Sequence, residues 1–281
     1  MIDMQAENRH GLLGDDASRL NAAQREAVTA TEGYVRVIAG AGTGKTRALA
    51  HRFAYLVNEL GIMPGNVLCA TFTNKAAAEM RERLNGLVGP RCRGMWVSTF
   101  HSMCVRMLRS DAEKLGFTRN FTIYDTDDSR RLMKDALKDL DIPERALSVR
   151  GALAEISRAK DKLTTPEDFE AGAGDDFRLK KVAQAYRVYQ RRLADADAMD
   201  FDDLIVNAVR LFETCPDVLE YYQNRFRYLM VDEYQDTNHA QYRFVSLLAQ
   251  RSGNLCVVGD DDQSIYKFRG ATIENILHFE E

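Results

Sequence analysis

The sequence predicts an α/β protein with a parallel central sheet, interrupted by an all-helical insertion. Three observations lead to this prediction. Short apolar runs alternate with amphipathic helical patterns in both end regions of the 281-residue chain, which is typical of parallel α/β sheets. The first run leads into a glycine-rich loop and then a helix, the context of a phosphate-binding turn. Between about residues 111 and 199 we find helical patterns and no convincing strand.

Five apolar runs are predicted to be buried strands, because each is short and bounded by polar residues or glycine. In chain order they span residues 35–38, 66–72, 96–100, 228–233 and 255–260. The carboxyl ends of parallel strands meet at one edge of a sheet, where open α/β folds bind their ligands. The residues that follow these strands are therefore the first candidates for a functional site.

Amphipathic helices are predicted between the strands from apolar residues at helical spacing. A helix from Leu20 to Val28, capped by Asn21, precedes the first strand. The helices after the first three strands have apolar faces over residues 49–60, 76–87 and 104–115. Two further helices, with apolar faces over residues 204–212 and 242–248, precede the last two strands.

The domain prediction assigns residues 1–110 and 197–281 to the α/β lobe and residues 111–196 to a helical insertion. Apolar patterns in the insertion predict helices over residues 132–140, 153–156 and 179–193. The first is expected to be capped by residues 127–129. The second lies between Pro143 and Pro166, and residues 171–176 are expected to form a loop before the third.

Composition excludes several classes of protein. A hydrophobic content of 45% is enough for a sizeable core, and a net charge of −4 argues against a protein that coats polyanions. The five cysteines are scattered without a C-x-x-C pair, so we expect free thiols in a reducing compartment and neither zinc nor a disulfide framework. Without a signal peptide or a membrane-spanning run, we expect a cytoplasmic protein that has no membrane partner.

The glycine-rich loop predicts a nucleotide site. Residues 39–46, Ala-Gly-Ala-Gly-Thr-Gly-Lys-Thr, match the Walker A pattern except that Ala39 stands where the pattern begins with glycine. Backbone N–H groups of such a loop point at phosphate, Lys45 can reach the β- and γ-phosphates, and Thr46 can place its hydroxyl on Mg²⁺. The candidate nucleotide contacts are Gln24, Ala39, Gly40, Ala41, Gly42, Thr43, Gly44, Lys45, Thr46 and Arg47.

Two acids at the end of another strand complete the predicted chemistry. Asp232 is expected to hold Mg²⁺ together with Thr46, and Glu233 to orient and deprotonate the attacking water. An acidic turn alone is weak evidence, but both pairs fall at carboxyl ends of strands of one predicted sheet. Gln263 is placed to touch the γ-phosphate. The catalytic candidates are therefore Lys45, Asp232, Glu233 and Gln263.

Three groups of polar and aromatic residues at other strand ends predict a track for single-stranded DNA. Hydroxyls and backbone N–H groups bind phosphates, and aromatic rings stack on unpaired bases. The candidates are Thr71, Phe72, Thr73, Asn74, Lys75, Thr99, Phe100, His101, Tyr266, Phe268 and Arg269. Taken singly, Phe72 and Phe100 would be interpreted as core residues and His101 as a histidine with satisfied hydrogen bonds. Three groups on one sheet favour the DNA interpretation.

These segments resemble a known family. Residues 39–46, 71–77, 231–237 and 259–271 closely resemble motifs I, Ia, II and III of the UvrD/PcrA/Rep helicases of superfamily one. Residues 97–102 are similar to motif Ib, residues 199–204 to another family segment, and residues 20–28 to the Q motif, with Gln24 the adenine-reading candidate. The order and spacing hold along nearly the whole chain.

The resemblance implies a RecA-like P-loop NTPase lobe that uses ATP and Mg²⁺, in a motor that walks 3′ to 5′ on single-stranded DNA and unwinds duplex. The helical insertion would touch duplex or single strand, so single-strand/duplex junctions are expected partners. The family continues with a second RecA-like lobe that supplies arginines to the γ-phosphate. Nothing in the 281 residues corresponds to that lobe, so we expect an N-terminal portion that binds ATP–Mg²⁺ weakly, hydrolyses it slowly or not at all, and does not unwind DNA.

Three alternatives remain open from the residues alone. The chain could belong to the motor of a recombination helicase-nuclease, or be an ATP-gated DNA-binding module without unwinding activity. A small-molecule P-loop kinase would explain Lys45 and Asp232 but not the three aromatic and polar groups. The pathway is open among DNA repair, replication restart, plasmid replication and recombination.

Overall fold

The computed structural model describes residues 20–40 and 44–260 of the chain. It divides into two compact units, each of which is formed by several segments. The first contains the described residues of Met1–Thr99, Tyr222–Gln235 and Leu248–Ile265, and the second those of Phe100–Tyr221, Asp236–Leu247 and Tyr266–Glu281. The predicted limits of the α/β lobe and the insertion, at residues 110 and 197, stay a prediction.

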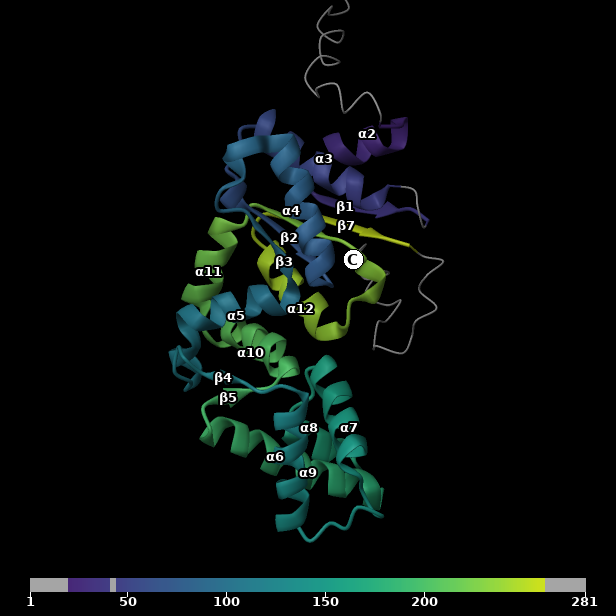
Figure 1. Ribbon diagram of the computed structural model, residues 1–281, viewed down its shortest axis with the longest axis vertical. Helices are drawn as coiled ribbons and strands as arrows, with labels where there is room; N and C mark the ends of the chain where they lie inside the picture. The colour runs from purple at the N-terminus through teal and green to yellow at the C-terminus, as the bar shows by residue number, and fades with distance from the viewer. Residues whose placement is uncertain (1–19, 41–43, 261–281) are drawn as a thin grey trace, which may run out of the picture. The chain divides into compact units, whose positions relative to one another are not determined.

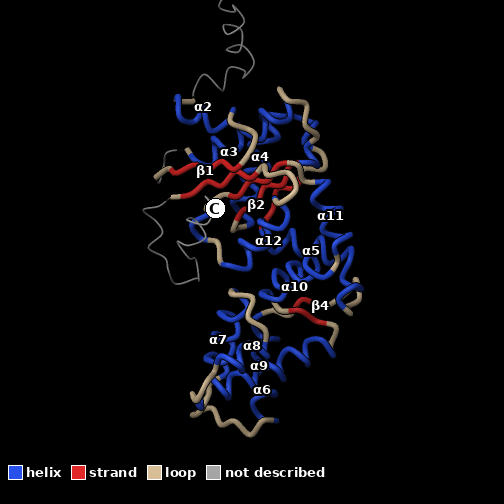
Figure 2. The backbone as a smooth tube through the Cα atoms, turned by 180° about the vertical axis from the view of Figure 1, so that it is seen from behind, coloured by secondary structure: helices blue, strands red, loops and turns tan. Residues whose placement is uncertain are grey.

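The first unit is built on a sheet of five parallel strands among the described residues (Figure 1, Figure 2). The strands are β1 (Tyr34–Ile38), β2 (Val67–Thr71), β3 (Trp96–Thr99), β6 (Tyr228–Val231) and β7 (Leu255–Gly259). Their order is β1-β7-β6-β2-β3, with every pairing parallel. The α/β fold class is confirmed, and each of the five predicted strands is present with its ends shifted by at most two residues. Residues 66, 72, 232–233 and 260 lie just outside the strands, and Phe100 begins a helix instead of ending β3. Strand β1, which was predicted to be buried, is only partly buried.

Two helices cover one face of this sheet. The helices of the first unit are α2 (Ala22–Thr29), α3 (Lys45–Asn58) and α4 (Asn74–Val88), with the 3₁₀ turns η2 (Pro64–Asn66) and η3 (Gly89–Cys92). Alternate strand residues such as Cys69, Met230 and Val258 pack in one buried cluster with Phe53 of α3 and Leu84 of α4. Every second side chain of a strand points to the same face of the sheet, and α3 and α4 each present an apolar face at helical spacing. These two apolar surfaces meet at this interface. The packing fixes α3 relative to β1, and with it the loop that joins them.

The second unit consists mainly of helices. They are α5 (Phe100–Asp111), α6 (Thr126–Asp139), α7 (Val149–Asp161), α8 (Pro166–Gly172), α9 (Phe177–Asp195) and α10 (Phe201–Thr214), with the 3₁₀ turn η4 (Ala112–Leu115). Three elements, α11 (Pro216–Arg225), η5 (Tyr234–Asp236) and α12 (His239–Ala249), span points where the chain passes between the units. The buried cluster of this unit joins α6, α7 and α9 through residues such as Met133, Ile156 and Tyr189.

Several expectations for the helical region are wrong in detail. The stretch contains a strand, because β4 (Thr122–Ile123) pairs in parallel with β5 (Ala198–Met199); two-residue strands are too short to leave a periodic pattern. The helix expected between Pro143 and Pro166 is present as α7. A further helix that was not predicted, α8, begins at Pro166, since proline is favoured in the first turn and Thr165 provides the cap. That helix extends over residues 171–172, the first two residues of the predicted loop. Helix α6 is capped by Asp125, not by residues 127–129.

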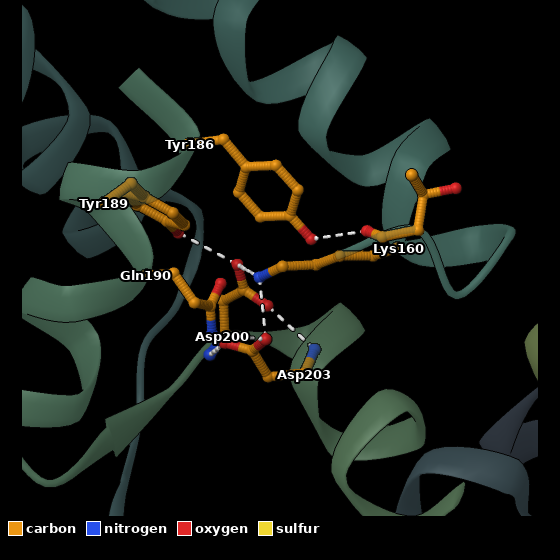
Figure 3. Close-up of polar contacts among 7 residues, drawn as sticks. Lys160, Tyr186, Tyr189, Gln190, Asp200 and Asp203 are labelled. Carbon is orange, nitrogen blue, oxygen red and sulfur yellow. Dashed lines mark hydrogen bonds and ion pairs between the residues drawn. The ribbon is translucent and has the colours of Figure 1, made fainter. Parts of the chain in front are cut away.

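A buried ion cluster ties three elements of the second unit together (Figure 3). Lys160 of α7 is 1% exposed, and its Nζ lies 2.7 Å from Asp200 Oδ2 and 2.8 Å from Asp203 Oδ1. Tyr189 of α9 donates its hydroxyl to Asp200, and Gln190 donates its amide to Asp203. Burial lowers the pKa of Lys160, but the two carboxylates outweigh this effect and raise it, so the lysine is charged. Burial raises the pKa of Asp203 to about 6.

The last residue of α7 is expected to make folding depend on pH. Burial raises the pKa of Asp161 from 3.8 to about 6, the neighbouring Asp202 adds to the shift, and the hydrogen bond from Asn238 opposes it. The folded chain keeps a proton that the unfolded chain releases, so this group makes the fold less stable as the pH rises through this window. An Asp161→Asn variant keeps the acceptor for Asn238. It should gain about 1 kcal/mol of unfolding free energy near neutral pH, a figure reduced for partial exposure, and less at acid pH.

Urea unfolding at a series of pH values from about 4 to 7 checks this expectation. The exposed Asp135 of α6 provides a matched control, since Asp135→Asn removes a carboxylate from the surface of the same unit. A constant difference between wild type and Asp161→Asn across the series would contradict the assignment.

No helix in the described part of the chain is long and apolar enough to cross a membrane.

Candidate nucleotide site

The glycine-rich loop joins the carboxyl end of β1 to the first residue of α3. The N–H of Ala39 donates to the carbonyl of Gly259 at 3.0 Å, so the start of the loop is fixed to β7. Gly44 is the N-cap of α3 and has a left-handed backbone with φ of 85°. Ala41, Gly42 and Thr43 lie outside the described residues. The described ends of the loop have the strand–loop–helix geometry that directs a helix N-terminus at an anion.

The described part of the loop shows why glycine is needed at position 44. A Cβ at this position would lie 3.0 Å from Nε2 of Gln24, and an L-residue with this φ is strained by about 1–2 kcal/mol. Gln24 also closes the capping box of α2 with Asn21. The side chain of the adenine-reading candidate therefore lies beside the loop.

A Gly44→Ala variant is expected to weaken ATP–Mg²⁺ binding by about tenfold or more. The free loop would relieve the strain by leaving the conformation that binds nucleotide, and strain of this size then changes the binding constant by that factor. Titration with a fluorescent ATP analogue measures the affinity. Gly86→Ala in α4 is the matched control, since an added Cβ there meets nothing within 4 Å. Equal affinity of the Gly44 variant and wild type would show that the loop does not bind nucleotide.

Lys45 is held between two carboxylates at the ends of neighbouring strands. Its Nζ lies 3.5 Å from Asp260 Oδ2 and 3.6 Å from Glu233 Oε2. Lys45 is 9% exposed and Asp260 is 2% exposed. The order β1-β7-β6 explains the convergence, because the three residues follow three adjacent strands at their carboxyl ends. A cation at this position can exchange its carboxylate partners for phosphate oxygens.

Thr46 and Asp232 place two oxygen atoms that could bind a metal ion close together. The Thr46 hydroxyl donates to Asp232 Oδ2 at 3.2 Å, and Asp232 Oδ1 accepts the N–H of Glu233 at 3.0 Å. The backbone of Asp232 is fixed by its bond to the carbonyl of Ala70. Burial raises the pKa of Asp232, the nearby charge of Glu233 adds to the shift, and the Thr46 bond opposes it. A divalent cation would remove the cost of this buried charge.

The donor set fits magnesium and a nucleotide. Mg²⁺ prefers hard oxygen ligands and is bound through few protein groups, usually one or two, in phosphate-transfer sites, and Thr46 with Asp232 provides such a pair. Arg47 fits a ligand as well, because its buried Nη2 has no hydrogen-bond partner among the described residues. Gly44, having no side chain, caps none of the N–H groups of the first turn of α3. These groups remain suited to phosphate.

Two residues of this site were missed as candidates in the sequence. Asp260 is buried against Lys45, and Gln235 is 6% exposed and bonded to both Glu233 and Asp260. Both stand in segments that resemble helicase motifs: Asp260 directly follows β7, and Gln235 stands two residues after Glu233. A polar residue near the end of a predicted strand was the signal that could have identified them. Their role depends on the contact between the chain segments that follow β6 and β7, which the sequence does not display.

The first group of DNA candidates lies at the carboxyl end of β2. Thr71 is buried, and its hydroxyl donates to the carbonyl of Thr73. Thr73 caps α4 by accepting the N–H of Ala76. Phe72 is half-buried, and Thr73, Asn74 and Lys75 are exposed. Three of these five residues therefore present polar groups to solvent at the start of α4.

The second group is divided between the two units. Thr99 ends β3 in the first unit and is 7% exposed. Phe100, in the second unit, is buried, and its ring meets Phe244 edge-on at 6.4 Å. The ring of Phe100 is thus a core contact. His101 is half-buried with its ring 5.5 Å from that of Phe201, and burial lowers its pKa.

The remaining candidates lie outside the described residues. They are Gln263, Tyr266, Phe268 and Arg269.

Comparison with known proteins assigns the chain to a family. The model of the UvrD/REP helicase N-terminal domain matches residues 20–281. An ATP-dependent DNA helicase PcrA of Staphylococcus epidermidis is 54% identical over 262 residues, which cover 93% of this chain and 36% of the relative. A protein of the same name from Staphylococcus aureus is 53% identical over 264 residues, 94% of this chain and 36% of the relative. The chain thus spans about a third of the length of these relatives, and it belongs to the UvrD/REP helicase N-terminal domain family.

Proposed function

We propose that this chain is the first, ATP-binding lobe of a DNA helicase that moves 3′ to 5′ along single-stranded DNA. The observation that carries the proposal is the convergence of Lys45, Thr46, Asp232 and Glu233 at the carboxyl ends of β1 and β6. An isolated phosphate-binding turn needs only the first two residues. The acids add the groups that hydrolysis requires.

In this proposal each residue has a separate task. Lys45 leaves its two carboxylates for the β- and γ-phosphates, and Thr46 and Asp232 hold Mg²⁺, which neutralises phosphate charge when bound. Glu233 accepts a hydrogen bond from the attacking water and takes its proton. Gln24 reads the adenine beside the loop. The buried position of Asp232 keeps its carboxylate fixed for the metal.

We further propose that a second lobe, outside these 281 residues, closes over the γ-phosphate and contributes arginines. The proposal is supported by the share of the relatives that the chain spans. Loss of an arginine finger lowers phosphoryl-transfer rates by about 10³- to 10⁵-fold. The 281-residue chain on its own should therefore bind ATP–Mg²⁺, hydrolyse it slowly and not unwind duplex.

The proposed DNA partner is single-stranded DNA and its junctions with duplex. The exposed polar residues at the start of α4 are available for phosphate contacts. Tyr266, Phe268 and Arg269 are proposed to stack on bases, and Gln263 to connect them with the γ-phosphate.

Fluorescence anisotropy of labelled oligo-dT and of a duplex of equal length tests the function, with and without a non-hydrolysable ATP analogue. We expect single-stranded DNA to be preferred, the analogue to change its affinity, and Phe268→Ala combined with Arg269→Ala to weaken binding by about tenfold or more. Binding of ATP without any binding of DNA would favour a kinase. DNA binding that survives the double substitution would remove the proposed track.

A further inference from the structure

One side-chain amide joins the proposed catalytic acid to the end of a neighbouring strand. Nε2 of Gln235 donates to Glu233 Oε2 at 2.6 Å, and Oε1 of Gln235 accepts the backbone N–H of Asp260 at 3.0 Å. A backbone N–H can only donate and a carboxylate can only accept. The two partners therefore fix which end of the amide is oxygen, and each atom is in its proper place.

The end of β7 is built for this contact. A Cβ at Gly259 would lie 2.8 Å from Oε1 of Gln235, closer than real Cβ contacts. Glycine thus allows the backbone to approach the amide. Gln235 is 6% exposed, so a buried amide whose bonds were broken would incur a large desolvation cost. The contact therefore requires both glycine at the end of β7 and an amide side chain at position 235.

Glu233 needs such a partner. Its side chain is 40% exposed, which leaves it room for other rotamers, and its backbone has a φ of 51°. Lys45 lies 3.6 Å from the carboxylate and is expected to turn toward phosphate when ATP binds. The short bond from Gln235 does not depend on Lys45, so it can hold the carboxylate after the lysine has moved.

We propose that Gln235 is a positioning residue for ATP hydrolysis. Its amide N–H holds the Glu233 carboxylate in the orientation that activates water, and its carbonyl oxygen makes that orientation depend on the position of Asp260. A shift at the end of β7 is thereby passed to the proposed catalytic acid. This inference rests on the proposed function, because it requires Glu233 to act on water.

A Gln235→Glu variant tests the proposal. Glutamate keeps the side-chain size and the acceptor for Asp260, but it replaces the donor by a second carboxylate beside Glu233, and two such groups share a proton. In single-turnover assays with protein in excess over ATP, hydrolysis should fall by about tenfold or more near neutral pH, where the shared proton keeps Glu233 from acting as a base. It should stay low toward alkaline pH, where the two carboxylates repel each other and no donor holds Glu233. ATP–Mg²⁺ affinity should stay within about threefold of wild type, because a positioning group acts on the chemical step.

Two further variants test whether the loss of activity comes from the hydrogen bonds of Gln235. Gln235→Met removes both bonds, so it should lose hydrolysis without recovery at alkaline pH, and it replaces the glutamate variant if that one does not fold. Gln250→Glu, at an exposed position after α12, is the matched control. Wild-type rates and a wild-type pH profile in the Gln235 variants would overturn the proposal, as would loss of ATP binding together with hydrolysis.

Glu233→Gln in the same assay separates this inference from the proposed function. If Glu233→Gln hydrolyses ATP like wild type, the proposed function fails and the inference with it. If Glu233→Gln is inactive while the Gln235 variants hydrolyse normally, the function stands and only the positioning role of Gln235 is wrong.

Discussion

Replacing Glu233 by glutamine is expected to lower the rate of ATP hydrolysis by about 10²- to 10⁴-fold, the usual contribution of a general base. Glutamine has nearly the same shape and can still contact water, but it cannot take the proton. The change should leave ATP–Mg²⁺ affinity within about threefold, because Lys45, Thr46 and Asp232 keep their places and the loss falls on the transition state.

Single-turnover release of labelled phosphate measures the rate, and titration with a fluorescent ATP analogue measures the affinity. Glu82→Gln provides the matched control, since Glu82 is exposed on α4 of the same unit. An equal fall in affinity and rate would place Glu233 among the groups that bind ATP instead of those that act on water. An unchanged rate would mean that another group activates the water.

The strands and the main site could be predicted because their signals are local. Each strand is a short apolar run. Asp232 stands immediately after one of them, and Thr46 follows the glycine-rich loop that comes after another. The sequence also predicts that strand ends converge, since parallel strands share an edge, and the structure places these two side chains 3.2 Å apart. The order of strands within the sheet has no such local signal.

The roles of Gln235 and Asp260 depend on that order. Because β7 lies between β1 and β6, the residue after β7 meets Lys45 from one neighbour and Gln235 from the other. In the sequence these two polar residues are separated by 25 positions, and nothing near either one indicates that they are in contact. The short strands β4 and β5 were missed for a related reason, since two residues bonded to a distant segment have no period of their own.

Lys160 could not be distinguished from a surface lysine in the sequence, yet its replacement is expected to have the largest effect on stability. Lys160→Met removes the cation and leaves Asp200 and Asp203, which are 8% and 2% exposed, without their ion pairs. Removing one partner of a buried pair costs about 3–5 kcal/mol of unfolding free energy. Urea unfolding measures the loss, and Lys180→Met on the exposed side of α9 should change stability by less than about 0.5 kcal/mol.

The loss in Lys160→Met should depend on pH and on the second acid. Without the lysine, burial and mutual repulsion favour the protonated carboxyls, so the folded chain binds protons that the unfolded chain releases. The variant is then expected to lose less stability near pH 5 than near pH 8. Adding Asp203→Asn removes one uncompensated charge while keeping an acceptor for Gln190, so it should recover about 1 kcal/mol or more of the loss in a double-mutant cycle. Additive losses at every pH would show that the methionine variant is destabilised by packing, and that the charge of Lys160 is not what joins α7 to the start of α10.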